Sequence, residues 1–193
     1  MPRDYLVLAR AAVVRAQTRA KARIVGVQDV NEAAGDAAQA KLQELEEDLA
    51  ANIGGAERTL RVLSTVREFC LERTGHEPFT YFRVDFRDKE AQAVEYASLA
   101  DLMDVRLVHL IDGSLSDGQK AGRRYEVFML DLSQYSGKRL RHGTRVLELV
   151  GDHFVSRTTR VKDSSPRVGD TARNLNAILR GGPIFDLALL RDA

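Results

Sequence analysis

A basic group of residues around a glycine-rich segment is the feature of this sequence with the clearest chemical meaning. Residues 112–122 contain three glycines among Asp, Ser and Gln residues, a composition typical of a loop. Four cations precede this segment or lie at its end: Arg106, Lys120, Arg123 and Arg124. A flexible loop that carries several cations can follow the phosphate backbone of DNA into the minor groove without reading bases. We therefore expect these residues to contact double-stranded DNA, with an affinity that falls as salt rises.

Intramolecular pairing of the same cations remains an open alternative. Arg123 and Arg124 have acidic neighbours close in the sequence, namely Asp112, Asp117 and Glu126. The predicted helix over residues 89–104 does not favour insertion into the major groove, because it carries four acids and only one base. Contact through the loop, without sequence specificity, is the interpretation that fits these observations.

Residue types used in catalysis are present, but their spacing does not predict an enzyme. The sequence has neither the GxxxxGK[ST] motif of phosphate-binding loops nor the GxGxxG motif of dinucleotide-binding folds. No two histidines are four residues apart, and Ser114 and Ser116 have no base nearby in the sequence. We expect no catalytic residue, no cofactor and no metal site, and hence no enzymatic activity of the chain alone.

Three other features have structural explanations. His109 lies in an apolar stretch, which favours a hydrogen-bonded histidine in the core. Cys70 is the only cysteine, which excludes an internal disulfide and a multi-thiolate zinc site, and it is expected to be a small buried side chain. An acidic group is interpreted as the solvated face of a helix: Glu44, Glu46, Glu47 and Asp48.

The composition is that of a globular protein with a balanced total charge. Of 193 residues, 44% are hydrophobic and 30% are charged, and the formal net charge is +1. No apolar run approaches the roughly 20 residues of a membrane span, and the first residues lack the apolar stretch of a secretory signal. The resulting expectation is a cytoplasmic protein without membrane association.

The balanced total hides blocks of opposite charge. Residues 1–23 carry six bases and one acid, whereas residues 28–58 carry eight acids and two bases. Residues 138–193 are basic again, with eleven bases and six acids. We expect the first two blocks to pair with each other within the molecule.

Apolar periodicity predicts helices in the first part of the chain and a mixture of elements after Pro78. Helices are expected over 3–22, over a short segment from Val27 to a break or bend at Gly35, over 42–53 and over 56–73. Alternation predicts strands over 82–86 and 124–132, which enclose a helix at 89–104, a segment at 105–111 that fits either helix or strand, and the loop. The order helix, strand, helix and long-tipped hairpin over about residues 56–135 resembles a winged-helix module.

Signals are weaker after residue 135. Strands are predicted at 144–150 and 154–161, a linker at 163–169 and a helix at 171–180. The apolar tail at 184–190 either docks on the domain or contacts a partner.

Several segments resemble one family. The opening Pro2-Arg3-Asp4-Tyr5-Leu6, the helix after it and residues 27–34 (VQDVNEAA) resemble the lid of AAA+ ATPases, in particular bacterial relatives of the origin-recognition and helicase-loader type. Residues 41–48 (KLQELEED), 107–111 (LVHLI) and 120–131 (KAGRRYEVFMLD) are similar to the C-terminal part of that family. The resemblance implies a mainly α fold with a small β component: a lid-like subdomain at 1–54, a winged-helix-like domain at 55–135 and an accessory segment at 136–193.

This sequence lacks the Walker A and Walker B motifs that such ATPases carry ahead of the lid. The resemblance implies for Arg3 the role of a sensor-2 arginine, whose guanidinium reaches the γ-phosphate of a nucleotide. One arginine cannot position nucleotide and Mg²⁺ alone, so a partner core is required for that role. A separate P-loop subunit, a stand-alone DNA-binding remnant and a piece of a longer ATPase all remain open.

The residues and the resemblance together predict a noncatalytic DNA-binding and regulatory module of an AAA+ system, which contacts the DNA backbone through a basic wing. The alternative is a protein-interaction adaptor that uses an exposed Leu187–Leu190 tip or the acidic 44–48 face. A further alternative is a subunit that docks on a separate P-loop ATPase and supplies Arg3 in trans. DNA binding should weaken steeply with salt, whereas hydrophobic docking should not.

Overall fold

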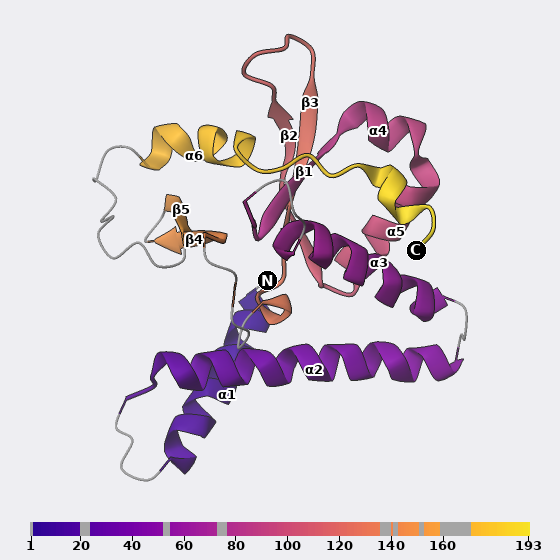
Figure 1. The fold of residues 1–193 in the computed structure, drawn as a ribbon. Helices are drawn as coiled ribbons and strands as arrows, with labels where there is room; N and C mark the ends of the chain where they lie inside the picture. The colour runs from indigo at the N-terminus through magenta and orange to yellow at the C-terminus, as the bar shows by residue number, and fades with distance from the viewer. Residues whose placement is uncertain are drawn as a thin grey trace. The chain divides into compact units, whose positions relative to one another are not determined.

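The computed structural model describes residues 2–19, 24–51, 55–72, 77–135, 140, 143–150, 153–158 and 171–193. These residues form mostly helices, together with one three-stranded and one two-stranded antiparallel sheet (Figure 1). The expected combination of much helix with a small amount of strand is therefore confirmed. The chain divides into two compact units, residues 1–56 with 132–139 and residues 57–131 with 140–193. Residues 140–193, expected to lie in a separate accessory segment, belong to the second unit.

The first unit contains two packed helices, α1 (Pro2–Thr18) and α2 (Val27–Ala51). Small side chains are buried on both helices, so that their backbones approach closely: Ala12, Ala16, Ala33 and Ala34. The prediction of a break or bend at Gly35 is wrong, because α2 is continuous through this residue. A glycine inside a helix costs only about 0.5–1 kcal/mol relative to alanine, which is too little to end a helix that its neighbours stabilise.

The second unit is built on an antiparallel sheet in the order β1-β3-β2 (Figure 1). Its strands are β1 (Tyr81–Asp85), β2 (Val108–Ser116) and β3 (Arg124–Leu130). The register of β2 against β3 shifts between Leu110 and Leu115, so β2 bends but continues. Residues 112–116, expected in the loop, are therefore strand, and the tip of the hairpin is limited to residues 117–123. Residues 105–111, left open between helix and strand, include the start of β2.

Side chains pack on both faces of this sheet. On one face, Phe82 and Phe128 stack with ring centroids 5.5 Å apart. Phe82 also contacts Phe185, which packs edge-to-face against Phe69 of α3 (Gly55–Leu71). The face of α3 that packs inward includes four buried residues: Leu63, Val66, Phe69 and Cys70.

The opposite face is covered by α6 (Thr171–Arg180) and by the start of β4 (Arg145–Val150). Tyr81, Tyr125 and Val127 form a buried cluster there with Leu179 and Leu147. The strand β4 pairs with β5 (His153–Thr158), so the weakly predicted strands are confirmed up to residue 158, and residues 159–161 of the second prediction lie outside the described residues. The predicted linker at 163–169 lies outside the described residues.

Two short helices, α4 (Phe86–Ala91) and α5 (Ala93–Asp104), replace the single helix predicted at 89–104. Asp85 ends β1 and caps α4, because its Oδ1 accepts a hydrogen bond from the Arg87 amide at 3.0 Å. Gln92, with φ −126° and ψ 54°, separates the two helices. The inner face of α5 buries Leu99 and Leu102.

The C-terminal end of α5 is a Schellman motif with a non-glycine residue at its turn. The Arg106 amide donates to the Met103 carbonyl at 3.0 Å, and the Leu107 amide donates to the Leu102 carbonyl at 2.9 Å. Arg106 has φ 59°, a left-handed conformation that side chains other than glycine and asparagine rarely adopt. This turn directs the chain from α5 into β2.

The last residues complete the second unit: of the two alternatives left open for the apolar tail, docking on the domain is the one that the structure shows. Arg83 of β1 donates its amide to the Pro183 carbonyl at 2.8 Å and accepts from the Phe185 amide at 2.7 Å. Phe185 and the two ends of the 3₁₀ helix η2 (Leu187–Leu190) are fully buried. The exposed Leu187–Leu190 tip that the adaptor alternative requires is therefore not exposed. Across the described parts of the chain, no helix combines the length and apolarity that crossing a membrane requires.

Candidate nucleic-acid interface

The tip of the β2–β3 hairpin is an ordered turn held by Asp117. Its Oδ1 accepts hydrogen bonds from the amides of Gln119 (2.8 Å) and Lys120 (3.2 Å), and its Oδ2 accepts one from the Tyr125 hydroxyl (2.9 Å). The Asp117 amide donates to the Arg123 carbonyl at 2.9 Å, which closes the turn. Hydrogen bonds from the Gln119 amide and the Tyr125 hydroxyl lower the pKa of Asp117 below its ordinary value. The tip therefore projects from the second unit in a defined conformation (Figure 1).

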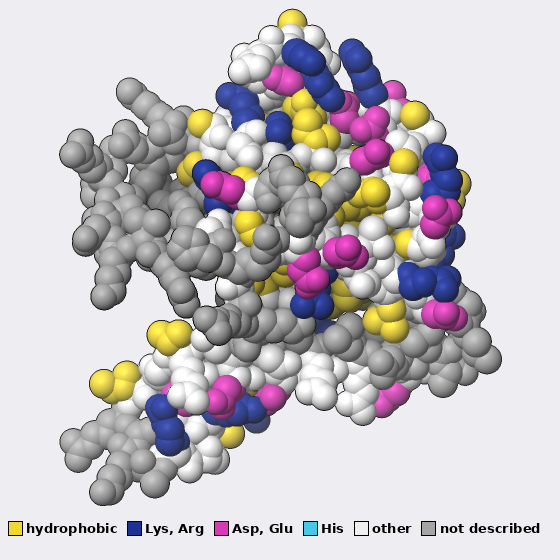
Figure 2. Space-filling view, in the orientation of Figure 1, with side chains coloured by type: hydrophobic (Ala, Val, Ile, Leu, Met, Phe, Trp, Pro, Cys, Tyr) yellow, Lys and Arg dark blue, Asp and Glu magenta, His cyan; other side chains and the backbone are white. Residues whose placement is uncertain are grey.

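Lys120 in this tip and Arg124, the first residue of β3, are the two predicted cations that the end of the hairpin exposes. Both side chains are exposed, and neither has an ion-pair partner in the part of the chain that the structure describes. In the orientation of Figure 2, Lys and Arg side chains gather around the upper end of the hairpin. These two residues are thus available to an anionic partner.

Arg123 is held by an ion pair inside the unit. Its Nε donates to Oδ2 of Asp85 at 2.6 Å, and its guanidinium lies 5.3 Å from the centre of the Tyr125 ring. Asp85 is buried, so this is a charged hydrogen bond in a partly desolvated setting. The sequence suggested Asp112, Asp117 or Glu126 as partners, but the ion pair forms with a residue of β1.

Arg106 lies at the other end of the sheet from the hairpin tip. It precedes β2, whereas the tip follows β2, and the strand has nine residues. At about 3.3 Å per residue the two ends are roughly 25–30 Å apart. The structure therefore brings Lys120, Arg123 and Arg124 together and leaves Arg106, whose side chain is exposed, on a separate part of the surface.

The buried side chain of Glu126 joins α4 and α5 to the hairpin. Glu126 of β3 accepts from Lys89 Nζ and from the Tyr96 hydroxyl, both at 2.7 Å. Lys89 also lies 4.5 Å from the centre of the Tyr96 ring. The only base in the 89–104 segment is thus paired within the unit.

The outer face of α5 is acidic and weakly apolar. Val94 is 65% exposed, and Ala97, Asp101 and Asp104 are exposed on the same side of the helix. No Lys or Arg occurs in Ala93–Asp104. This arrangement supports the expectation that α5 does not enter the major groove.

Arg180 is a residue of this site that sequence reasoning missed. From the last turn of α6 its Nε donates to the Ser116 carbonyl at 2.8 Å, and its Nη2 donates to the Ser116 hydroxyl at 3.1 Å. It therefore holds the end of β2 that leads into the tip. The predicted helix at 171–180 was correct, but no local pattern indicates that its end returns to a strand 64 positions away.

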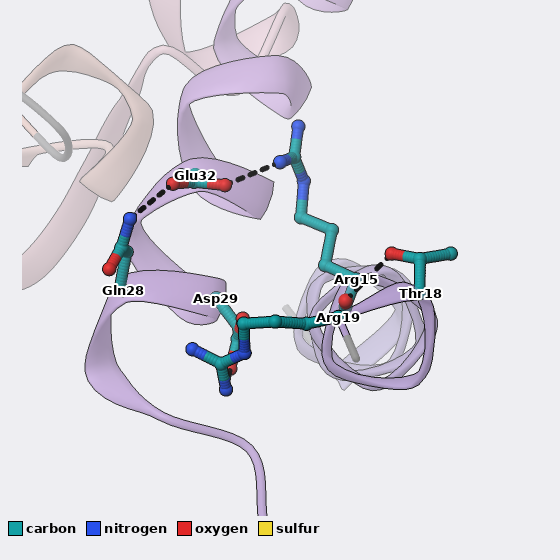
Figure 3. Close-up of a pocket in the computed structure, with 6 residues that line it drawn as sticks. All are labelled: Arg15, Thr18, Arg19, Gln28, Asp29 and Glu32. Carbon is teal, nitrogen blue, oxygen red and sulfur yellow. Dashed lines mark hydrogen bonds and ion pairs between the residues drawn. The ribbon is translucent and has the colours of Figure 1, made fainter. Parts of the chain in front are cut away.

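The first unit contains a pocket of about 210 Å³ at the ends of α1 and α2, lined by Arg15, Thr18, Arg19, Gln28, Asp29 and Glu32 (Figure 3). Its charged groups pair with one another: Arg15 with Glu32 at 2.6 Å and with Asp36, and Arg19 with Asp29 at 2.8 Å. Asp29 is buried and also accepts from the Gly26 amide at the start of α2. Ion pairs between the two helices therefore line this pocket. The predicted pairing of the first two charge blocks is confirmed for these residues.

The remaining sequence candidates divide into confirmed and undescribed residues. His109 is hydrogen-bonded to Asp131 at 2.7 Å with 12% of its side chain exposed, and Cys70 is buried, which raises the pKa of its thiol. The side chains of Arg3, Glu44, Glu46 and Asp48 lie outside the described residues. Among the residues that are described, no three His, Cys, Asp or Glu side chains gather as metal ligands.

No family model, curated protein or solved structure matches this chain. The hairpin and its surroundings are therefore the basis on which a function is inferred.

Proposed function

We propose that this protein is a noncatalytic DNA-binding and regulatory module that contacts the phosphate backbone of double-stranded DNA through the β2–β3 hairpin. The observation that carries the proposal is the ordered end of the hairpin, where the side chains of Lys120 and Arg124 are exposed and have no ion-pair partner among the described residues. Two cations at fixed spacing can bind phosphates at a lower entropic cost than cations on a disordered loop.

The order of elements supports a winged-helix-like assignment for the hairpin domain. The helix α3 is followed by β1, two short helices and then the hairpin, and the hairpin's second strand lies between its first strand and β1. The helix pair α1 and α2 is consistent with a lid-like subdomain of an AAA+ system. In this proposal the partner core is a separate or preceding P-loop ATPase.

The charge distribution favours binding without sequence specificity. Cations lie on the hairpin, whereas Asp101 and Asp104 lie on the outer face of α5, where phosphates would be repelled. Backbone contacts position a protein on DNA but carry little sequence information. We expect similar affinities for duplexes of different sequence.

Fluorescence anisotropy with a labelled duplex of about 30 base pairs tests the proposal. Micromolar binding is expected at low salt, and the Lys120→Ala/Arg124→Ala variant should lower the slope of log K against log[salt] by about 1.8. The matched control is Arg61→Ala/Arg191→Ala, which removes the same charge from exposed arginines that pair with Glu57 and Glu95. Arg106→Ala, measured separately, shows whether DNA also reaches the other end of the sheet.

Absence of binding by the wild-type chain at low salt would overturn the DNA proposal. Equal loss of binding in the control variant would show that only total charge matters, which would also contradict a defined contact surface. The role of Arg3 stays a separate prediction: Arg3→Ala should lower the ATPase rate of a partner P-loop subunit if the arginine acts in trans, and an unchanged rate excludes it.

A further inference from the structure

We propose that Arg87, in the first turn of α4, is a further phosphate-contacting residue, so that the DNA-contact surface continues from the hairpin onto the helix pair. This inference rests on the proposed function and identifies a binding residue that the sequence did not suggest. It is carried by one geometric observation: α4 and the hairpin both donate hydrogen bonds to the same buried carboxylate, that of Asp85.

Asp85 fixes the position of Arg87 relative to the hairpin. Oδ1 of Asp85 accepts from the Arg87 amide at 3.0 Å, while Oδ2 accepts from Arg123 Nε at 2.6 Å. Asp85 also pairs with Tyr125 in the register of β1 against β3. The backbone of Arg87 is therefore held near the tip end of β3, beside Arg123 and Tyr125, the two neighbours of the exposed Arg124.

Three acidic side chains near this surface already have internal partners. Asp85 binds Arg123, Asp117 closes the hairpin turn, and Glu126 binds Lys89 and Tyr96. Asp88, next to Arg87, is half-buried. These three carboxylates are therefore already occupied, whereas Glu90 and Asp186 are exposed.

Arg87 itself is exposed and has no ion-pair partner within the described residues. Its side chain thus adds a third uncompensated positive charge to those of Lys120 and Arg124. Three such charges, on one hairpin and one helix turn of the same unit, can each contact a phosphate of a DNA strand. Arg123 has a different role in this arrangement: it is a positioning residue, because its guanidinium is already bound to Asp85.

The test measures duplex affinity of the full chain between 50 and 200 mM salt for the wild type, Arg87→Gln and Arg87→Lys. Arg87→Gln is expected to reduce the slope of log K against log[salt] by about 0.9, so that its affinity changes about 3.5-fold less than that of the wild type over this range. Arg87→Lys keeps the charge and should keep the wild-type slope. Both variants retain the backbone amide that Asp85 binds, so the cap of α4 is preserved. Arg61→Gln, which removes an exposed arginine of α3, is the matched control and should leave the slope unchanged.

Each outcome decides the matter. A wild-type slope for Arg87→Gln, together with a reduced slope for Lys120→Ala/Arg124→Ala, overturns the role of Arg87 and leaves the proposed function intact. An equal reduction in Arg87→Gln and Arg87→Lys shows a structural role and also overturns the inference. No binding by any protein, including the wild type, is a failure of the proposed function itself.

Discussion

Single carboxylates determine how the hairpin presents its cations. Asp117 accepts hydrogen bonds from two amides and one hydroxyl at the tip. Asp85 accepts from the Arg87 amide, where it caps α4, and from the Arg123 guanidinium. Both contacts are made by short side chains, which lose little conformational freedom when they are fixed. The two carboxylates thus act on the same turn, because Arg123, which Asp85 binds, also accepts from the Asp117 amide.

The lowered pKa of Asp117 predicts a loss of stability in acid. Because folding lowers this pKa, the unfolded chain takes up the proton first as pH falls below about 4, and the contribution of Asp117 is lost as pH drops through the folded pKa. Urea unfolding of the wild type and Asp117→Asn, at pH 7 and at several values between pH 4 and 2, measures this effect. We expect a shallower decline for the variant, and identical declines would contradict the assignment.

Arg106 predicts a substitution that stabilises the protein. Its φ of 59° is unfavourable for a residue with a Cβ, so Arg106→Gly should raise the free energy of unfolding by about 0.5–1 kcal/mol. The control is Gly122→Ala at φ 78°, which should lower it. Denaturant unfolding at neutral pH checks both predictions. A destabilised Arg106→Gly would contradict the first, because it would show that the arginine side chain stabilises the protein by more than its left-handed conformation costs.

At the scale of elements, the C-terminal segment is part of the core of the second unit. Phe185 is fully buried against Phe69 and Phe82, so Phe185→Ala should cost about 3–5 kcal/mol of stability. The adjacent Ile184 is 40% exposed, and Ile184→Ala should cost less than about 1 kcal/mol. Thermal and urea unfolding of the pair separate side-chain burial from a general effect of altering the tail; similar losses in both would contradict the burial argument.

Elements with strong local signals were predictable from the sequence. The apolar face of α3 and the bounds of α6 follow from periodicity and from Gly181. The division between α4 and α5 was not predictable, because Gln92 does not break helices by its own propensity and the interruption depends on tertiary contacts. The strand character of residues 112–116 was hidden for a similar reason: pairing with β3 overrides the turn propensity of Gly113.

The same limit applies to the candidate site. Local charge was enough to propose Lys120 and Arg124 as candidates, and both are exposed. It was not enough to find the partner of Arg123, which lies 38 positions away, or the contact of Arg180 with Ser116, 64 positions away. Pairings across such separations are set by the topology of the fold, which one sequence does not reveal.

At the scale of the whole molecule, the two units have different kinds of core. Among the residues whose burial the structure describes, those buried in α1 and α2 include four alanines, whereas the largest fully buried side chains, including Tyr81, Phe128 and Phe185, belong to the second unit. Burial of apolar area stabilises by about 25 cal/mol per Å², so alanine contacts contribute far less than aromatic ones.

This difference predicts unequal protection from hydrogen exchange. Amides of α1 and α2 should exchange through openings of lower free energy than amides of β1 and β3. Higher salt should lower the protection of α1 further, because Arg15 and Arg19 hold it through partly exposed ion pairs. Native-state exchange followed by mass spectrometry measures both, and uniform protection across the chain would contradict two independent cores.

The position of Phe185 also bears on how the protein is made. A ribosome adds about 5–20 residues per second, so roughly 5–20 s separate the synthesis of Phe82 from that of its neighbour in space, about 100 residues later. During that interval the edge of β1 that Pro183 and Phe185 later cover is open, and Phe82 lacks one of its aromatic contacts. The nascent chain therefore passes through a stage at which an unpaired strand edge is exposed. At this stage the chain is most prone to aggregate, and a chaperone would have its largest effect.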